Sequence, residues 1–198
     1  MARTKVFGIG FQKTGTTTLG AILDQLGYRT ASYHSFRDFA KKEGVTWEEV
    51  KARALKVARD HDAGKDTPWP LLYDFLDREF PGSKFVHVVR KPESWIRSAV
   101  HDFKDHPNAL HTLIYGVPSP LGNEAVWLER YKRHNEEVAA YFADRPGDYI
   151  RFQLEDGIDV PTLCEFLGQP AIDFKPPVAN TRMRKTIKMA WWKLTGQS

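Results

Sequence analysis

The stretch that decides the fold is Phe7–Leu26, FGIGFQKTGTTTLGAILDQL. With Val6 before it, the stretch begins with a short apolar run, residues 6–9, that ends at Gly10 and is typical of a buried strand. Further along, apolar residues recur with the period of one helix face, and Gly27 follows as a stop signal. These apolar residues are Leu19, Ile22, Leu23 and Leu26. The stretch therefore predicts a strand, a loop and a helix, in that order.

The loop of residues 10–18 has the chemistry of an anion-binding site. Free backbone N–H groups at the start of a helix, and the positive end of the helix dipole, favour a phosphate or sulfate group. One lysine and several hydroxyls add further donors. The residues that we expect to bind the anion are Lys13, Thr14, Gly15, Thr16, Thr17 and Thr18.

The spacing of the loop differs in one position from the P-loop of ATPases and kinases. Gly10 and Gly15 keep the G-x-x-x-x-G interval, but Thr16 stands where those enzymes carry lysine. Nucleotide kinases use that lysine on the β- and γ-phosphates, so its displacement to Lys13 disfavours triphosphate chemistry. The pattern K-T-G-T-T-x-L resembles the 5′-phosphosulfate loop of the sulfotransferases, which bind 3′-phosphoadenosine 5′-phosphosulfate (PAPS). An incidental Gly/Thr turn is the alternative.

Composition predicts one ordinary globular domain over residues 1–198. The chain is 41% hydrophobic and 27% charged, and its net charge of +4 suits an anionic cofactor or nucleic acid. The single cysteine, Cys164, rules out an internal disulfide and fits a reducing compartment. Residues 1–5 lead directly into the first strand without a signal peptide, and no apolar run reaches membrane-spanning length. We therefore expect a cytoplasmic protein.

A second candidate anion site follows the apolar segment 84–90. This predicted strand ends in Arg90, Pro92 then opens a helix, and Ser98 lies about two helical turns beyond Arg90. The pair R-x-P…S resembles the sulfotransferase site for the 3′-phosphate, in which a guanidinium and a hydroxyl hold that group. A strand-end arginine in a surface salt bridge is the alternative.

Asp66 is the candidate general base. Pro68 and Pro70 predict an extended loop after it. Sulfotransferases similar to this chain place the residue that activates the acceptor in a comparable segment, usually as a histidine, so the aspartate is a departure. A helix-capping role is the alternative. Three histidines, His101, His106 and His111, are further candidates for the base.

Residues 101–122 are expected to be rich in loop and to form an acceptor pocket or lid, or a loop packed on the core. Other predicted elements are a strand over residues 28–33, a helical region from Ser35, a helix capped by Thr46 and a strand over residues 148–154. The acids at the end of that last strand, Glu155 and Asp156, are the best indication of a metal site of the NTPase kind.

The C-terminal part extends the resemblance. Residues 163–180 look like the C-terminal pattern of one sulfotransferase subfamily. Sulfotransferases tend to fold a basic C-terminal loop over the nucleotide, which implies a nucleotide-binding role for Arg182, Arg184 and Lys185. Residues 182–195 form a basic amphipathic pattern, which suits packing on the domain, on a twin subunit in a homodimer, or on a membrane surface.

The resemblance implies an α/β fold, namely a three-layer αβα sandwich around a mainly parallel sheet, like that of the P-loop NTPases. It also implies transfer of the sulfuryl group from PAPS to an acceptor, leaving adenosine 3′,5′-bisphosphate (PAP), with Lys13 and Asp66 as catalytic residues and no metal. The acceptor would be a small molecule or glycan, with no nucleic acid as partner. Two alternatives remain: an Mg²⁺-dependent P-loop phosphotransferase, and a non-catalytic nucleotide or nucleic-acid binder that uses the basic tail.

Overall fold

The computed structural model of the protein describes residues 3–174, and in it a five-stranded parallel sheet forms the centre of the fold. The strand order is β2-β3-β1-β4-β5, and each neighbouring pair is parallel. The strands are β1 (Val6–Gly8), β2 (Thr30–Ala31), β3 (Ala63–Gly64), β4 (Lys84–Val89) and β5 (Tyr149–Gln153). Because the strands are parallel, the loops after them all leave from one edge of the sheet.

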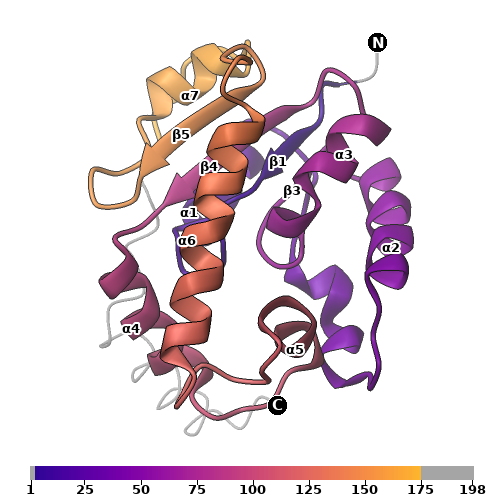
Figure 1. The fold of residues 1–198 in the computed structure, drawn as a ribbon. Coiled ribbons are helices and arrows are strands. Elements are labelled where there is room, and N and C mark those ends of the chain that lie inside the picture. Colours follow the sequence, from indigo (N-terminus) through magenta and orange to yellow (C-terminus); the bar gives the residue numbers. More distant parts are fainter. Residues whose placement is uncertain (1–2, 175–198) are drawn as a thin grey trace, which may run out of the picture.

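Helices cover both faces of the sheet and make three layers (Figure 1). The α-helices are α1 (Thr16–Gln25), α2 (Trp47–Asp60), α3 (Tyr73–Glu79), α4 (Pro92–Phe103), α5 (Ala109–Tyr115), α6 (Glu124–Tyr141) and α7 (Val160–Phe166). Two 3₁₀ helices, η1 (Tyr33–Lys41) and η2 (Trp69–Leu72), complete the described part. The predicted αβα sandwich with a parallel sheet is confirmed.

The alternation of side chains along the strands separates two apolar cores. Phe7 and Phe85 point to one face, where Val138 of α6 joins them together with residues of α2 and α3. The neighbouring residues Val6 and Val86 point to the other face, against α1 and α7. The run of residues 6–9 is therefore buried on both sides, as a central parallel strand requires.

Local signals account for several element boundaries. Thr46 caps α2 in a capping box with Glu49, as predicted. The cap of η1 is Ser32 and not Ser35, because the Ser32 side chain accepts the N–H of His34. The stretch 101–122 is also less irregular than expected: α4 continues to Phe103, and α5 begins after its cap residue Asn108.

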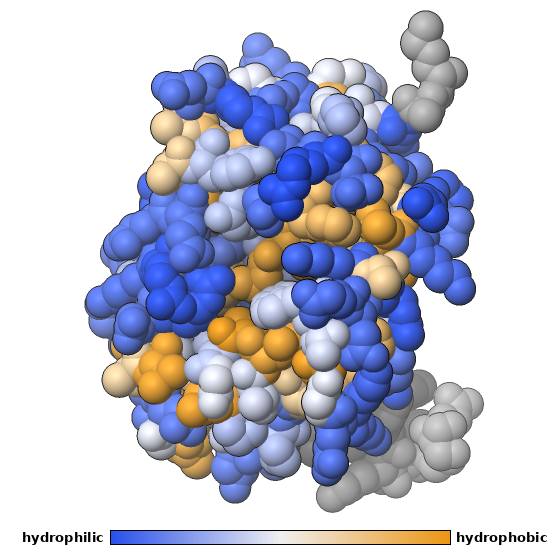
Figure 2. All heavy atoms as spheres, turned by 45° about the vertical axis from the view of Figure 1, so that its right-hand side comes forward, coloured by the Kyte–Doolittle hydropathy of each residue, from blue (hydrophilic) through white to orange (hydrophobic). Residues whose placement is uncertain are grey.

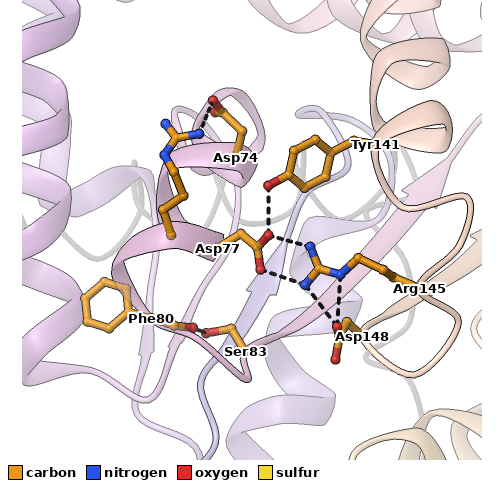
Figure 3. Close-up of polar contacts among 8 residues, drawn as sticks. Asp74, Asp77, Phe80, Ser83, Tyr141, Arg145 and Asp148 are labelled. Atoms are coloured by element: carbon orange, nitrogen blue, oxygen red, sulfur yellow. Dashed lines mark hydrogen bonds and ion pairs between the residues drawn. The ribbon is translucent and has the colours of Figure 1, made fainter.

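An ionic cluster links the helices to β5 at the opposite edge of the sheet, where the strands begin (Figure 3). Arg145 contacts the Asp77 carboxylate with two nitrogens, at 2.5 and 2.8 Å, and also donates to Asp148 at 2.9 Å. Tyr141 adds a hydrogen bond to Asp77 at 2.8 Å. The guanidinium holds the pKa of Asp77 below its usual value. This cluster is structural, since it joins α3 and the end of α6 to the start of β5.

The face shown in Figure 2 is mixed in character. Seen from the side on which α2 and α3 come forward, apolar side chains lie in patches between charged and polar ones (Figure 2). Within residues 3–174, no helix is both long enough and apolar enough to cross a bilayer.

Candidate functional site

A cavity of about 680 Å³ lies at the edge where the strands end. Its lining includes a residue from the segment after each strand: Lys13 after β1, Tyr33 after β2, Asp66 after β3, Arg90 after β4 and Leu154 after β5. β1 is the middle strand, between β3 and β4, so its loop lies at the centre of this edge. Such a position, where the connections diverge to the two halves of the sheet, is where open α/β sheets bind ligands.

Two glycines allow the loop after β1 to turn closely against its neighbours. A Cβ on Gly10 would lie 2.2 Å from the carbonyl oxygen of Val88, so only glycine fits beside β4. Gly15 has a φ of 88° and serves as the N-cap of α1. A Cβ there would lie 2.7 Å from Cδ1 of Leu154. The G-x-x-x-x-G interval is therefore set by the approach of this loop to the sheet and to the segment after β5.

The start of α1 provides the anion-binding geometry. The N–H of Leu19 donates to the carbonyl of Gly15 at 3.0 Å, so the N–H groups of residues 16–18 come before the first hydrogen bond inside the helix. Gly15, Thr16, Thr17 and Thr18 all line the cavity. Thr14 is fully buried instead, and its hydroxyl donates to the carbonyl of Phe11 at 2.6 Å. The Thr14 side chain therefore stabilises the loop from inside the protein, whereas we predicted that it would contact the bound anion.

Lys13 and Arg90 bring two positive charges to this loop. Lys13 has a φ of 70° and pairs with the carboxylate of Asp102 on α4. Arg90 donates from its guanidinium to the carbonyl of Lys13 at 3.2 Å. The hydroxyl of Tyr131 holds the backbone of Arg90, since it accepts the N–H and donates to the carbonyl, both at 2.8 Å.

Ser98 lies on α4 and lines the same cavity as Arg90. The strand and the helix after it thus place the two predicted 3′-phosphate ligands in one site, together with the loop after β1. Asp102 is a further cavity residue that was not among the predicted site residues; it follows Ser98 by one helical turn. The signal that could have identified Asp102 was its position on the predicted helix, one turn after Ser98.

Asp66 faces the cavity from the loop after β3. Its φ is 70°, and its Oδ1 accepts the N–H of Thr67 at 2.9 Å. Burial raises the pKa of this carboxyl above the usual value for aspartate, and the Thr67 hydrogen bond and nearby Lys65 and Lys13 only partly oppose the effect. Asp66 is not the cap of the helical turn that follows, because η2 begins at Trp69 after Pro68.

A buried hydrogen-bond chain connects these parts of the site. Gln12 is 5% exposed, its Oε1 accepts the hydroxyl of Thr67 at 2.8 Å, and its Nε2 donates to the hydroxyl of Tyr115 at 2.6 Å. Trp95 of α4 donates from Nε1 to the carbonyl of Gln12 at 2.8 Å. The chain joins the loops after β1 and β3 to α4 and α5. Local sequence motifs could not reveal this hydrogen-bond chain, because its members are far apart in the sequence.

The three candidate histidines are in different places. His101 is exposed on α4 and does not line the cavity, and His106 is exposed beside Asp105 at 3.4 Å. His111 of α5 lines the cavity, but burial lowers its pKa to about 4. The structure therefore does not place His101 or His106 at the site, and of the three only His111 contributes to its wall.

The acids after β5 follow the strand directly, and Glu155 contacts the start of α4. The Glu155 carboxylate accepts the backbone N–H of Lys91 at 3.1 Å. Among residues 3–174, no group of three or more His, Cys, Asp or Glu side chains is placed to hold a metal ion. Arg182, Arg184 and Lys185, and the predicted helix over residues 182–195, lie outside the described residues.

Two kinases are among the solved structures that resemble this chain. Shikimate kinase from Bacteroides thetaiotaomicron aligns over 84% of this chain and 99% of its own, with a TM-score of 0.52 and 19% identity. Deoxyadenosine kinase from M. mycoides, with bound dATP, aligns over 84% of this chain and 97% of its own, with a TM-score of 0.47 and 17% identity. The shikimate kinase supports the P-loop NTPase-like fold, whereas such low identities do not indicate a shared activity.

Comparison with the curated proteins found no match. A family profile described as "Sulfotransferase domain" matches residues 5–121 and 102–184, which together include both predicted anion sites and Asp66. The match extends over most of the chain. The chain therefore belongs to the sulfotransferase domain family.

Proposed function

We propose that the protein transfers the sulfuryl group of PAPS to the hydroxyl of an acceptor. The observation that carries this proposal is that one cavity is lined by the residues of both predicted anion sites and by a carboxyl group of raised pKa: the loop after β1 with Lys13, the pair Arg90 and Ser98, and Asp66. Two separate anion sites match a donor with a 5′-phosphosulfate at one end of its ribose and a phosphate on the 3′ oxygen.

The cation and the N–H groups of the first loop suit the leaving group. As the acceptor oxygen forms its bond to sulfur, the bond from sulfur to the bridging oxygen breaks, and negative charge develops on that oxygen. Lys13 and the N–H groups of residues 16–18 are donors that would stabilise this charge. Arg90 and Ser98 would hold the 3′-phosphate, remote from the reacting sulfur, and so contribute to binding and orientation.

Asp66 would accept the proton of the acceptor hydroxyl. A general base is effective when its pKa approaches the working pH, and burial moves the pKa of Asp66 in that direction. The hydrogen bond from Thr67 fixes one oxygen of the carboxylate, and Asp66 lines the cavity. The proton passes to Asp66, and the bisphosphate is the second product.

Calorimetric titration with PAP, ATP and ATP plus Mg²⁺ tests the proposal against the two alternatives. We expect PAP to bind without added metal and to raise the melting temperature. At about 100 times its dissociation constant, such a ligand stabilises the folded state by about 2.7 kcal/mol. Tight binding of Mg-ATP without binding of PAP would instead support a phosphotransferase.

A further inference from the structure

We infer that Tyr131 of α6 is a positioning residue for the 3′-phosphate: its hydroxyl holds the backbone of Arg90 and so directs the guanidinium. This inference rests on the proposed function, which assigns Arg90 to the 3′-phosphate. It goes beyond that function by naming a buried residue that acts on the nucleotide through Arg90. Three observations carry it: the hydrogen bonds at the end of β4, the burial of Tyr131, and a second contact from α6 to the end of β1.

Arg90 stands at a corner of the chain, between a strand and a helix. β4 ends one residue earlier at Val89, whose carbonyl accepts the N–H of Leu154 at 2.8 Å. The first residue of α4 is Pro92. Arg90 therefore lies after the last strand residue and before the first helical one, and its backbone N–H and carbonyl need partners from another part of the fold.

The hydroxyl of Tyr131 is the partner of both groups. It accepts the N–H of Arg90 at 2.8 Å and donates its own proton to the carbonyl of the same residue, also at 2.8 Å. A hydroxyl can make both bonds at once, because it has one proton to donate and two lone pairs to accept with. The two bonds fix the peptide groups on both sides of the Arg90 Cα, and so fix the direction in which the arginine side chain leaves the backbone.

Tyr131 is itself held by close packing. It is fully buried, and its ring lies flat against Trp95 of α4, with centroids 4.2 Å apart and an interplanar angle of 7°. Burial raises the pKa of Tyr131 above the usual value for tyrosine, so the hydroxyl keeps the proton that it donates. Because no part of the side chain is exposed, Tyr131 can influence a bound nucleotide only through the residues that it contacts.

The same helix also holds the end of β1. His134 follows Tyr131 by about one helical turn, is fully buried, and donates from Nε2 to the carbonyl of Ile9 at 2.8 Å. The loop that carries Lys13 begins directly after Ile9. α6 thus fixes the ends of both β1 and β4, from which the residues of the two predicted anion sites follow. A nucleotide with phosphates on the 5′ and 3′ oxygens of one ribose requires such a fixed spacing.

Tyr131→Phe tests the inference in the full-length protein, with PAP and adenosine 5′-phosphate as ligands, which differ only in the 3′-phosphate. The variant keeps the ring that packs on Trp95 and removes the hydroxyl. We expect calorimetry to show an affinity for PAP about tenfold lower than in the wild type, equivalent to about 1.4 kcal/mol. The affinity for adenosine 5′-phosphate should change by less than about twofold.

Tyr149→Phe is the matched control. It also removes a phenolic hydroxyl that contacts a buried side chain, Nδ1 of His87 at 2.9 Å, but Tyr149 lies at the start of β5, at the edge of the sheet opposite the cavity. The melting temperature should fall in both tyrosine variants, whereas the affinities for both nucleotides should stay at the wild-type values in Tyr149→Phe. A loss of preference for PAP in the control as well would attribute the effect to general destabilisation and would overturn the inference.

A double-mutant cycle shows whether Tyr131 acts through Arg90. In a protein that already carries Arg90→Ala, adding Tyr131→Phe should change the affinity for PAP by less than about twofold, because the guanidinium that the hydroxyl directs is absent. A further tenfold loss in that background would show that Tyr131 affects binding by another route, contrary to the inference.

Amide hydrogen exchange in the wild-type protein gives a second readout that requires no variant. The N–H of Arg90 should exchange as slowly as the amides inside β4, because the buried Tyr131 hydroxyl accepts it. Exchange at the rate of an exposed loop amide would overturn the inference even if Tyr131→Phe did not fold.

The outcomes separate this inference from the proposed function. If the wild-type protein binds PAP no more tightly than adenosine 5′-phosphate, the proposed function fails. If the wild-type protein prefers PAP and a folded Tyr131→Phe variant keeps the full preference, the proposed function stands and the positioning role of Tyr131 is overturned.

Discussion

Thr67 donates a hydrogen bond from its hydroxyl to Oε1 of Gln12, at 2.8 Å. Both side chains are buried, and the bond connects the loop that carries Asp66 to the loop that carries Lys13. Since Gln12 also binds Tyr115 and Trp95, the two loops are held in one rigid arrangement. The proposed chemistry requires this, because an in-line transfer depends on the position of the base relative to the leaving group.

Thr67→Val should lower turnover more than donor affinity. The substitution keeps the shape of the side chain but leaves a buried amide oxygen without its donor, at a cost of about 1–3 kcal/mol in stability. The measurement is kcat with a proven acceptor, beside the affinity for PAP. Thr67→Ser keeps the hydroxyl and is the control. An equal loss in both variants would show that packing of the methyl group matters, and not the hydrogen bond.

Lys13→Ala should reduce kcat by about 100-fold or more, because it removes a donor from the charge that develops on the leaving oxygen. The fold should survive, and circular dichroism checks this. Lys91→Ala is the matched control, since Lys91 is exposed and does not line the cavity. A rate near that of the wild type in Lys13→Ala would reduce the loop to a passive binding element.

Arg90→Ala should weaken binding of a 3′-phosphorylated nucleotide by about 1.5–3 kcal/mol, the scale of a charged hydrogen bond. Adenosine 5′-phosphosulfate lacks that phosphate, so its affinity should change little. Calorimetry with both nucleotides measures the difference. Equal losses for the two would assign Arg90 to the phosphosulfate end or to the structure of the Lys13 loop, whose carbonyl it contacts.

Asp66→Asn should leave nucleotide affinity nearly intact and lower the rate at saturating donor. The wild-type rate should rise with pH as the carboxylate forms, at a pH above the usual aspartate pKa because burial raises that pKa. The variant should lose this rise. If Asp66→Asn keeps full activity and the same pH profile, then the base is another group, and Asp102→Asn is the next variant to measure.

Protonation of the buried His87 should lower the stability of the protein in acid. It is buried between Tyr149 and Asn135, and burial lowers its pKa to about 4. The unfolded chain binds a proton near pH 6.5, so this contribution is complete above that pH and is lost as the pH falls toward about 4. At about 1.4 kcal/mol per pKa unit, the loss is on the order of 3 kcal/mol.

Denaturant unfolding at several pH values between 7.5 and 4 measures this contribution. The free energy of unfolding should fall less steeply with acid in His87→Gln than in the wild type. His106 is exposed, and His106→Gln should therefore keep the wild-type slope. Parallel slopes for the wild type and His87→Gln would show that His87 is not the group that titrates.

The sequence by itself determined the elements whose causes are local. The run of residues 6–9, the helix face from Leu19 and the glycines at positions 10 and 15 are adjacent in the chain, so period and spacing were enough to predict the strand, the loop and α1. The position of Arg90 between β4 and α4 could be predicted for the same reason, because the strand end, the proline and the helix follow one another directly. The capping box of α2 also spans only residues 46–49.

Only the tertiary structure decided which of these elements meet. β3 has two residues and no periodic signal, yet its place beside β1 brings Asp66 to the loop of Lys13. The bond between Gln12 and Thr67 spans 55 positions, and that between Gln12 and Tyr115 spans 103. Such contacts depend on strand order and helix packing, which arise from burial of both faces of the sheet at once. That is why the pairing of Asp102 with Lys13, which spans 89 positions, could not be predicted from local pattern.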